Sequence, residues 1–366
     1  DINYEYGTLE ITKKQLIFTA SSVTKEYDGL PIEPQDVHYD LHAIPSGHEV
    51  EIENIQTFSE IDTRDYIRTI KIWKDGLDAS SNFDIRINKE TLKIEPRKIT
   101  ILTETFTHVY NGMIQNVGTP LDKNGKLLEG HYFNFESLIS PIDVGVYTNT
   151  MDVQIYSNNG DVSSYYNVTM ETGKITIQKR EIKVTLSRVT EEYNGLSISG
   201  GMPQVMEGSL VGEHRFVKIH SEEKTIPGVH EVTFEVAIYS DATEVTHNYS
   251  ITYVRGILEI TKRYIVVETN DFMKVYDGLP IYVGNPMDIH HKLLPGHSLS
   301  IANSKTAIIP GVYENEMTVV ILSGGDNVTQ YYDIDYIFGD LTIEKRPITI
   351  TTNFMEKEYD GLPIET

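Results

Sequence analysis

The sequence predicts an all-β protein made of tandem small modules, each an immunoglobulin-like sandwich or a β-grasp-like sheet, arranged as an elongated rod. Three observations support this fold class. A Tyr-Asp/Asn-Gly triplet recurs every 83 residues along the chain. Hydrophobic residues alternate with polar residues in short runs, which is the period of a half-buried strand. No long window of the sequence has the periodicity of an amphipathic helix.

The repeat is carried by several markers that keep the same spacing. The triplets are Tyr27-Asp28-Gly29, Tyr110-Asn111-Gly112, Tyr193-Asn194-Gly195, Tyr276-Asp277-Gly278 and Tyr359-Asp360-Gly361. An isoleucine in the expected last strand of each module is the second marker: Ile11, Ile94, Ile177, Ile260 and Ile343. Loops accept insertions cheaply, so equal spacing in diverged copies indicates that the geometry of the module matters.

Two strands of each module are indicated most clearly. Alternating pairs in the expected first strand are Leu16/Phe18, Ile99/Ile101, Ile182/Val184, Ile265/Val267 and Ile348/Ile350. Alternating pairs in the expected central strand are Ile70/Ile72, Val153/Ile155, Val236/Ile238 and Val319/Ile321. Turn residues separate such runs at roughly ten-residue intervals, as all-β modules require. One short helix, near Gln204–Leu210 or near His290–Leu294, is compatible with the sequence.

The triplets are interpreted as structural turns. A tight turn needs backbone with positive φ, which Gly supplies freely and Asn or Asp tolerates. The preceding Tyr is expected to lay its ring on the core of its module, with its hydroxyl directed to solvent or to a backbone carbonyl. The alternative is a row of exposed Tyr rings on which a ligand stacks.

The register sets the boundaries of the modules. Complete modules are expected at 15–97, 98–180, 181–263 and 264–346 (modules 1 to 4). Residues 1–14 match the last strand of a preceding module, and residues 347–366 match the first strand and turn of a following one, so the chain is expected to be a window on a longer array. No Gly/Ser linker separates the modules, which favours a fairly stiff rod.

Composition narrows the class of function. The formal charge is −23, from 54 acidic and 31 basic residues, so nucleic acids and anionic membrane surfaces are disfavoured as partners. The chain has no cysteine, so each module is stabilised by packing without disulfides. No apolar run approaches the length needed to cross a bilayer, so direct membrane insertion of this segment is not expected.

Several longer motifs resemble the YDG and MBG-type repeats of bacterial surface proteins. They are Tyr-Asp-Gly-Leu-Pro at 27–31, 276–280 and 359–363, Pro-Gly-Val-Tyr-Glu-Asn at 310–315, Asp-Asn-Val-Thr-Gln-Tyr-Tyr at 326–332, and Gly-Asp-Leu-Thr-Ile-Glu-Lys-Arg at 339–346. The resemblance implies tandem modules in secreted, cell-wall-associated adhesins or fibrous stalks, without catalytic residues. His48, His131, His214 and His297 depart from the pattern, because such repeats often carry Gly-Asp there.

Catalytic and metal sites are not expected. The sequence contains no Gly-x-Ser-x-Gly, no phosphate-binding Gly loop and no His-Glu-x-x-His. The four register-matched histidines lie in different modules, too far apart to share one ion. The loops Asp75–Asp78, Asn158–Asp161 and Asp326–Asn327 are the better candidates for a calcium ion, but they lack the ligand spacing of a known calcium loop, which favours plain turns. No cofactor is therefore assigned.

The leading interpretation is a non-enzymatic stalk or spacer of an extracellular bacterial adhesin or fibre, which projects a distal binding region from the cell wall. One alternative is a repeat that itself binds host glycans or host proteins. Another is a subunit of a self-assembling filament, in which neighbouring copies pair through strand edges. An exposed row of aromatic rings beside polar side chains would favour glycan binding.

Overall fold

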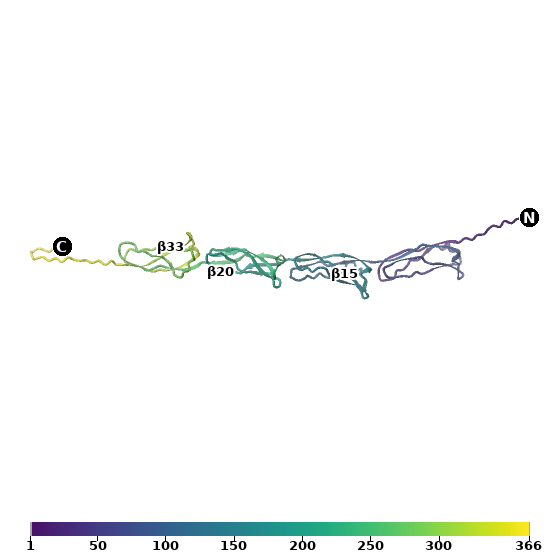
Figure 1. Ribbon diagram of the computed structural model, residues 1–366, viewed down its shortest axis with the longest axis horizontal. Helices are drawn as coiled ribbons and strands as arrows, with labels where there is room; N and C mark the ends of the chain where they lie inside the picture. The colour runs from purple at the N-terminus through teal and green to yellow at the C-terminus, as the bar shows by residue number, and fades with distance from the viewer. Residues whose placement is uncertain (1, 366) are drawn as a thin grey trace. The chain divides into compact units, whose positions relative to one another are not determined.

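The computed structural model describes residues 2–365 and confirms the all-β class. Among these residues every regular element is a β-strand or a short 3-10 helix, and none is an α-helix. The chain divides into two compact units between Arg180 and Glu181, so that modules 1 and 2 form the first unit and modules 3 and 4 form the second. Figure 1 shows the strands, with β15 labelled in the first unit and β20 and β33 in the second.

The strands recur in nearly the same order in each module. Module 1 contains β1 (Lys14–Thr19), β2 (Val23–Glu26), β3 (His38–Tyr39), β4 (His48–Ile52), β5 (Thr63–Tyr66), β6 (Ile70–Lys74), β7 (Leu77–Asp78), β8 (Phe83–Ile87) and β9 (Glu90–Glu95), with η1 (Leu41–Ala43) and η2 (Ser80–Asn82). Module 2 contains β10 (Arg97–Leu102), β11 (Phe106–Val109), β12 (Leu121–Asp122), β13 (Tyr132–Ser137), β14 (Gly145–Thr148), β15 (Met151–Ser157), β16 (Gly160–Asp161), η3 (Ser163–Tyr165), β17 (Tyr166–Glu171) and β18 (Lys174–Gln178).

Modules 3 and 4 follow the same plan. Module 3 contains β19 (Arg180–Leu186), β20 (Val189–Glu192), β21 (Ile198–Ser199), β22 (Pro203–Glu207), β23 (Arg215–Ser221), β24 (Glu223–Lys224), β25 (Gly228–Val232), β26 (Phe234–Ser240), β27 (Thr243–Glu244), η4 (Thr246–Asn248), β28 (Tyr249–Tyr253) and β29 (Gly256–Thr261). Module 4 contains β30 (Arg263–Glu268), β31 (Phe272–Val275), β32 (Met287–Asp288), β33 (His297–Ser304), β34 (Gly311–Glu314), β35 (Met317–Ser323), β36 (Asp326–Asn327), η5 (Thr329–Tyr331), β37 (Tyr332–Ile337) and β38 (Asp340–Glu344).

The open possibility of a short helix is wrong at both positions. Residues 203–207 form strand β22, whose Val184↔Val205 pairing with β19 is antiparallel. At the other position His291 has φ 51°, which is a left-handed conformation that ends a turn and cannot continue a right-handed helix.

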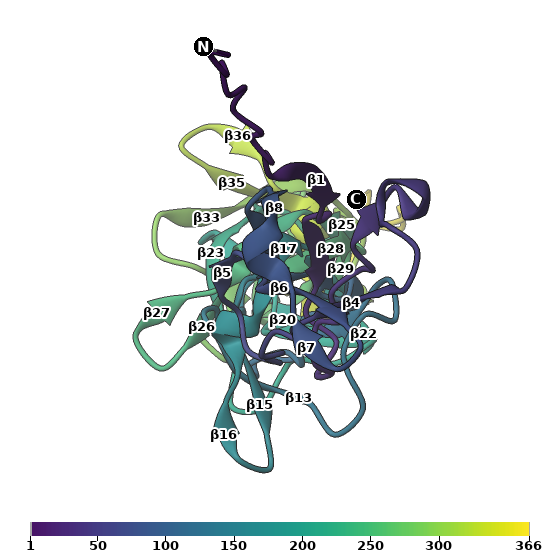
Figure 2. The same ribbon diagram turned by 90° about the vertical axis from the view of Figure 1, so that its right-hand side faces the viewer.

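Modules 1, 2 and 4 are each built from three small sheets, and module 3 has in addition the two-stranded sheet β21-β24. In module 1 the strand orders are β3-β1-β8, β4-β6-β7 and β2-β9-β5. The first strands β1 and β2 pair in parallel with the last strands β8 and β9, while the remaining pairs are antiparallel. Figure 2 shows β1 beside β8. Because β1–β2 and β8–β9 run in the same direction, the chain enters a module at one end and leaves it at the other.

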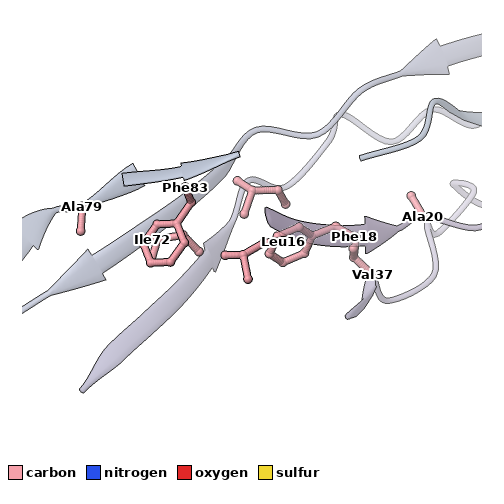
Figure 3. Close-up of a cluster of buried hydrophobic side chains, with 8 residues drawn as sticks. Leu16, Phe18, Ala20, Val37, Ile72, Ala79 and Phe83 are labelled. Atoms are coloured by element: carbon pink, nitrogen blue, oxygen red, sulfur yellow. The ribbon is translucent and has the colours of Figure 1, made fainter. Parts of the chain in front are cut away.

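Half of each module is a packed pair of sheets. On β1, Leu16 and Phe18 are buried, while Ile17 between them is 62% exposed, so the alternation predicted from the sequence is confirmed. They pack against Phe83 of β8 in the same sheet and against Ile72 of β6 in the facing sheet β4-β6-β7 (Figure 3). Two facing sheets with one core between them are the arrangement of a sandwich.

The other half contains one sheet covered by loops. In module 1, Leu92 and Ile94 of β9 pack with Ile32 and Phe58, which both lie outside strands. A backbone hydrogen bond of 2.9 Å from the Ile32 N–H to the Phe58 carbonyl joins these two loops. This half of the module therefore has a core although no second sheet faces the first.

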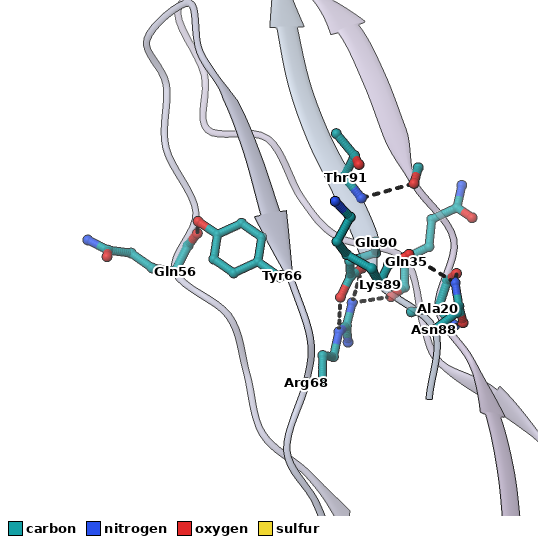
Figure 4. Close-up of polar contacts among 10 residues, drawn as sticks. Ala20, Gln35, Gln56, Tyr66, Arg68, Asn88, Lys89, Glu90 and Thr91 are labelled. Atoms are coloured by element: carbon teal, nitrogen blue, oxygen red, sulfur yellow. Dashed lines mark hydrogen bonds and ion pairs between the residues drawn. The ribbon is translucent and has the colours of Figure 1, made fainter. Parts of the chain in front are cut away.

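The buried residues between the two halves of a module, which we call the waist, differ chemically among the modules. In module 1 they are Arg68 and Glu90. In module 1 the Arg68 guanidinium forms hydrogen bonds of 2.6 and 3.0 Å with the Glu90 carboxylate and a bond of 2.8 Å with the Gln35 carbonyl (Figure 4). Glu90 is fully buried and Arg68 is 8% exposed. Since a buried charge needs a partner and further hydrogen bonds, this pair is one coupled structural unit.

The first prediction concerns this pair. Glu90→Ala leaves the Arg68 guanidinium buried without its counter-charge, and the cost is expected to be about 3–5 kcal/mol. The double variant R68M/E90G carries the residues that occupy the same register in module 2 (Met151 and Gly173), and it is expected to be less destabilised than the single variant. Hydrogen exchange of the amides in β9 of the full chain measures both. Equal loss of protection in the two variants would contradict the coupling.

Candidate functional site

The Tyr-Asp/Asn-Gly triplets form turns held by their own side chains. Gly29, Gly195 and Gly278 have φ between 79° and 80°. In module 1 the Asp28 carboxylate accepts the Leu30 N–H at 2.9 Å, and the same oxygen accepts the Lys25 ammonium at 2.8 Å. Lys25 also donates to the Leu30 and Pro31 carbonyls at 2.8 and 3.0 Å. These contacts fix the turn that follows the Tyr and so fix the direction of its ring.

The remaining triplets have the same geometry. Gly112 and Gly361 have φ of 73° and 78°. The side chain at the second position accepts the N–H two residues later in each case: Asn111 from Met113 at 2.9 Å, Asn194 from Leu196 at 2.8 Å, Asp277 from Leu279 at 3.0 Å and Asp360 from Leu362 at 3.1 Å. The triplets are thus side-chain-capped turns, and none of them joins two paired strands.

Within each compact unit, the Tyr of the first module contacts an aromatic residue of the second. The Tyr27 ring lies 4.6 Å from the Tyr165 ring, centroid to centroid. The Tyr193 ring lies 5.1 Å from that of Tyr331 and 6.0 Å from that of Tyr332. The Tyr27 ring also packs on the core of its own module. We call these two contact regions the joints 1–2 and 3–4.

The burial of the five tyrosines bears on the ligand-stacking alternative. Tyr110 and Tyr193 are only 3% and 5% exposed, and Tyr27 is half-buried. Tyr276 and Tyr359 are 39% and 96% exposed. The rings of Tyr27 and Tyr193 are engaged by protein contacts, so they do not present a stacking surface to a ligand.

An arginine at the boundary between the two modules bridges each joint: Arg97 begins β10 and Arg263 begins β30. Arg97 donates to the Lys126 carbonyl of module 2 at 2.7 Å and to the Tyr27 carbonyl of module 1 at 3.3 Å. Arg263 repeats both contacts, with Lys292 at 2.6 Å and Tyr193 at 3.3 Å. Arg263 also pairs with the Glu192 carboxylate at 2.9 Å. The planar guanidinium holds carbonyl groups of two modules at once, which suits its fixed set of donors.

In the second module of each joint, a histidine pairs with the tyrosine that follows Tyr165 or Tyr331 in the sequence. The Tyr332 hydroxyl lies 2.6 Å from Nδ1 of His297 and accepts the Leu294 N–H at 3.4 Å. In module 2, His131, Tyr166 and Leu128 repeat this arrangement, with distances of 2.6 and 3.2 Å. Because the hydroxyl already accepts the backbone N–H, its own proton is available to a neutral imidazole nitrogen.

The four register-matched histidines therefore have a structural place and do not meet. His214 pairs with Tyr249 at 2.7 Å inside module 3. His48 of module 1 faces Phe83, with ring centroids 5.6 Å apart. Among residues 2–365, no group of three or more His, Cys, Asp or Glu side chains is placed to hold a metal ion.

The acidic loops considered for calcium cap 3-10 turns. Asp78 accepts the Ser80 N–H and Asp161 accepts the Ser163 N–H, both at 2.8 Å. Asn327 accepts the Thr329 N–H at 3.1 Å. Within the described part of the chain, no helix has the length and apolar character needed to span a bilayer.

Sequence reasoning missed the partners of the triplet tyrosines. The motif at 326–332 includes Tyr331 without a role for it, and none of the repeat markers singles out Tyr165, although both residues contact the Tyr of the preceding module. The available signal is in the register: modules 2 and 4 carry Tyr165 and Tyr331 where modules 1 and 3 carry Asn82 and Asn248. Arg97 and Arg263 at the module boundaries are a second such signal.

The second prediction separates the turn from the joint. Gly195 and Gly278 have nearly the same φ, so Gly→Ala imposes a similar backbone strain at both, about 1 kcal/mol. A Cβ at Gly195 would also lie 3.3 Å from a methyl of Leu294 in the next module, whereas a Cβ at Gly278 meets nothing within 4 Å. Hydrogen exchange at the Leu294 amide should therefore accelerate in G195A and stay unchanged in G278A. The same exchange rate in both variants would contradict a joint contact at Gly195.

The third prediction concerns pH. Burial lowers the pKa of His131, His214 and His297 from the ordinary value of 6.5, because the charged imidazolium is poorly solvated there. The unfolded chain then takes up protons before the folded chain as the pH falls. The stability contributed by these groups is complete above pH 6.5 and is lost as the pH falls through their folded pKa values.

Calorimetric unfolding of the chain between about pH 8 and about pH 5 should therefore show decreasing transition temperatures. The triple variant H131N/H214N/H297N, whose amide oxygens can accept the tyrosine hydroxyls without titrating, should show a smaller decrease. An unchanged pH dependence in that variant would assign the effect to other groups.

Comparison with known proteins gives only distant likeness. No family model matches the chain, and no curated protein matches it. Among solved structures, Drosophila N-cadherin EC1-4 is 9% identical with a TM-score of 0.23, covering 90% of this chain and 100% of that one. The human desmocollin-1 ectodomain is 12% identical with a TM-score of 0.19, covering 77% and 67%. Cadherin-like domains 1 to 4 of zebrafish RET are 7% identical with a TM-score of 0.15, covering 91% and 100%. Likenesses this weak carry no argument about the function of this chain.

Proposed function

We propose that this chain is a non-catalytic spacer segment of an extracellular repeat protein, which holds a distal binding region away from a surface. In this proposal the modules belong to the YDG and MBG-type repeats that the sequence resembles, and the surface is a bacterial cell wall. The observation that carries the proposal is the construction of the joints. A tyrosine ring, an arginine and a continuous run of strand connect neighbouring modules within each unit.

The backbone at the joints supports a stiff connection. In joint 1–2 only Pro96 separates β9 from β10, and in joint 3–4 only Lys262 separates β29 from β30. The N–H of Tyr27 donates to the Glu95 carbonyl at 2.9 Å, and the N–H of Tyr193 donates to the Thr261 carbonyl at the same distance. The Tyr that reaches the next module is therefore tied to the closing strand of its own module. Such a connection lacks the Gly and Ser residues that give flexible linkers their freedom.

Charge supports the same role. A formal charge of −23 spread over 366 residues makes distant parts of the chain repel one another. This repulsion opposes folding back and non-specific association, although salt screens it beyond about a Debye length. In the proposal the partners of the segment are neighbouring modules, and the specific ligand belongs to another part of the protein.

One observation favours a binding role as the second candidate. On module 2, Tyr132 of β13 is 50% exposed and lies opposite Tyr156 of β15, with ring centroids 6.2 Å apart. An exposed aromatic pair on a sheet is a suitable platform for a sugar ring or for an aromatic side chain of a partner protein. Module 4 has Ser298 and Leu322 at these positions, so such binding would belong to single modules.

The fourth prediction tests the spacer by its length. Small-angle X-ray scattering of the chain should give an extended profile. Deleting residues 98–263 removes two modules in register and leaves Tyr27 to meet Tyr331. Since a compact 83-residue module has a radius of gyration of about 12 Å, this deletion should shorten the maximum dimension by roughly 60 Å or more. A globular profile, or a deletion that leaves the dimension unchanged, would contradict the spacer.

A further inference from the structure

Two phenol rings from neighbouring modules lie in near contact at each joint. The Tyr27 and Tyr165 rings have centroids 4.6 Å apart and planes inclined by 34°. The Tyr193 and Tyr331 rings have centroids 5.1 Å apart and planes inclined by 53°. Two phenyl rings joined by a single C–C bond have centroids about 4.3 Å apart, from two ring radii and one bond length. Each pair is therefore within about 1 Å of the separation in a biaryl, and biaryl rings are likewise twisted out of one plane.

We propose that Tyr27–Tyr165 and Tyr193–Tyr331 are sites of oxidative cross-linking, at which a bond between ring carbons ortho to the hydroxyls joins adjacent modules as dityrosine. The oxidant is a one-electron acceptor, such as a peroxidase supplied with hydrogen peroxide. The mechanical use of such a bond rests on the proposed spacer function, whereas its formation does not.

The coupling of each pair is a two-electron oxidation. The oxidant removes one electron and one proton from each phenol, which leaves two phenoxyl radicals. The two unpaired electrons form the new C–C bond between ortho carbons. Each of these carbons then gives up its hydrogen as a proton, and each phenol oxygen takes up a proton as its ring becomes aromatic again. In total the pair loses two electrons and two protons, which convert one molecule of hydrogen peroxide into two molecules of water.

The surroundings of the pairs favour coupling over escape of the radical. Tyr193 is buried, and Tyr27, Tyr165 and Tyr331 are half-buried, so an oxidant can reach at least one ring of each pair while water is kept from much of both. Within the described residues, no hydrogen bond holds the hydroxyl of Tyr27, Tyr165, Tyr193 or Tyr331. Each ring is therefore free of a polar contact that would oppose the small movement into bonding distance. Burial also raises the pKa of Tyr27 and Tyr193, so both enter the reaction as neutral phenols.

The cross-link would supply what this chain lacks. With no cysteine it cannot close a disulfide between modules, yet each joint places an oxidisable pair across the boundary. A covalent bond there would keep two modules together when one of them unfolds under load. It would also shorten the length of chain that unfolding can release, in the way a cross-link restricts any unfolded chain.

The fifth prediction is tested on the full chain at low concentration, treated with peroxidase and hydrogen peroxide, digested, and analysed by mass spectrometry for linked peptides. Peptides joining Tyr27 to Tyr165 and Tyr193 to Tyr331 are expected. Tyr165→Phe keeps the ring but removes the phenol, so it should abolish the first linked peptide and leave the second. Tyr331→Phe should do the reverse. The Tyr132–Tyr156 pair, 6.2 Å apart within one module, serves as an internal comparison.

Cross-links found at Tyr132–Tyr156 or between separate molecules, without linked peptides from either joint, would overturn the proposal. So would a linked peptide containing Tyr27 that persists at the same yield, through another tyrosine, in the Tyr165→Phe variant. These outcomes leave the scattering experiment unaffected, because the spacer proposal needs no covalent bond. A failure of the spacer and a failure of the cross-link are therefore distinguishable.

Discussion

The parallel pairing of the first and last strands is the constraint from which the rest of each module follows. Leu16 of β1 lies beside Ile85 of β8, and Lys25 of β2 lies beside Ile94 of β9. The first segment of the module, β1–β2, therefore runs along the last segment, β8–β9, in both halves of the module. Parallel strands place the start and the end of a module at opposite poles. The next module must therefore begin where the closing strand ends. The joint can then be built from a turn, a ring and an arginine, without a linker.

The waist is occupied by different kinds of side chain in different modules, although the backbone is the same. In module 1 the position holds the Arg68–Glu90 ion pair, while in module 2 Thr103 donates to the Asn149 carbonyl at 2.6 Å and accepts the Gly173 N–H at 2.9 Å. Module 4 repeats the second arrangement with Thr269, Asn315 and Gly339. Module 3 has apolar Leu186 and Val232 there. One backbone thus accommodates an ion pair, a neutral polar network or an apolar contact. In the two polar networks the side-chain oxygens of Asn149 and Asn315 are buried without a hydrogen-bond partner among the described residues, while their side-chain N–H groups donate to backbone carbonyls.

Local patterns in the sequence were enough for the strands and the turns. The pair Leu16/Phe18 alternates with exposed neighbours because one face of β1 is buried, and the Gly residues of the triplets have the positive φ that their turns require. The pairing of β1 with β8 could not be predicted from such patterns, because the two strands are far apart in the sequence. A different neighbouring strand would give β1 the same alternation of buried and exposed residues. The same holds for Tyr27. Its ring is covered both by the core of its own module and by Tyr165 of the next module, and an aromatic residue at this position predicts burial without showing which module provides it.

The acidic loops use their polar side chains for contacts with the local backbone. The side chains of Asp78, Asp161 and Asn327 are of the kinds that bind cations, and in the structure each accepts the backbone N–H two residues later. Short polar side chains near a turn satisfy local backbone groups first, because that contact orders few additional residues. The carboxylates of Asp78 and Asp161 therefore act in turns.

One tyrosine ring per joint couples neighbouring modules, and a distance measurement across joint 3–4 tests this coupling most directly. Because the chain has no cysteine, T252C and T318C introduce two unique labelling positions, both exposed, on modules 3 and 4. Pulsed electron–electron spin resonance of the doubly labelled chain should give a narrow distance distribution. Tyr331→Asn, which places at this joint the residue found at that position in modules 1 and 3, should broaden it while leaving the fold of module 4 intact. A distribution that is equally broad with and without the Tyr331 ring would contradict the coupling.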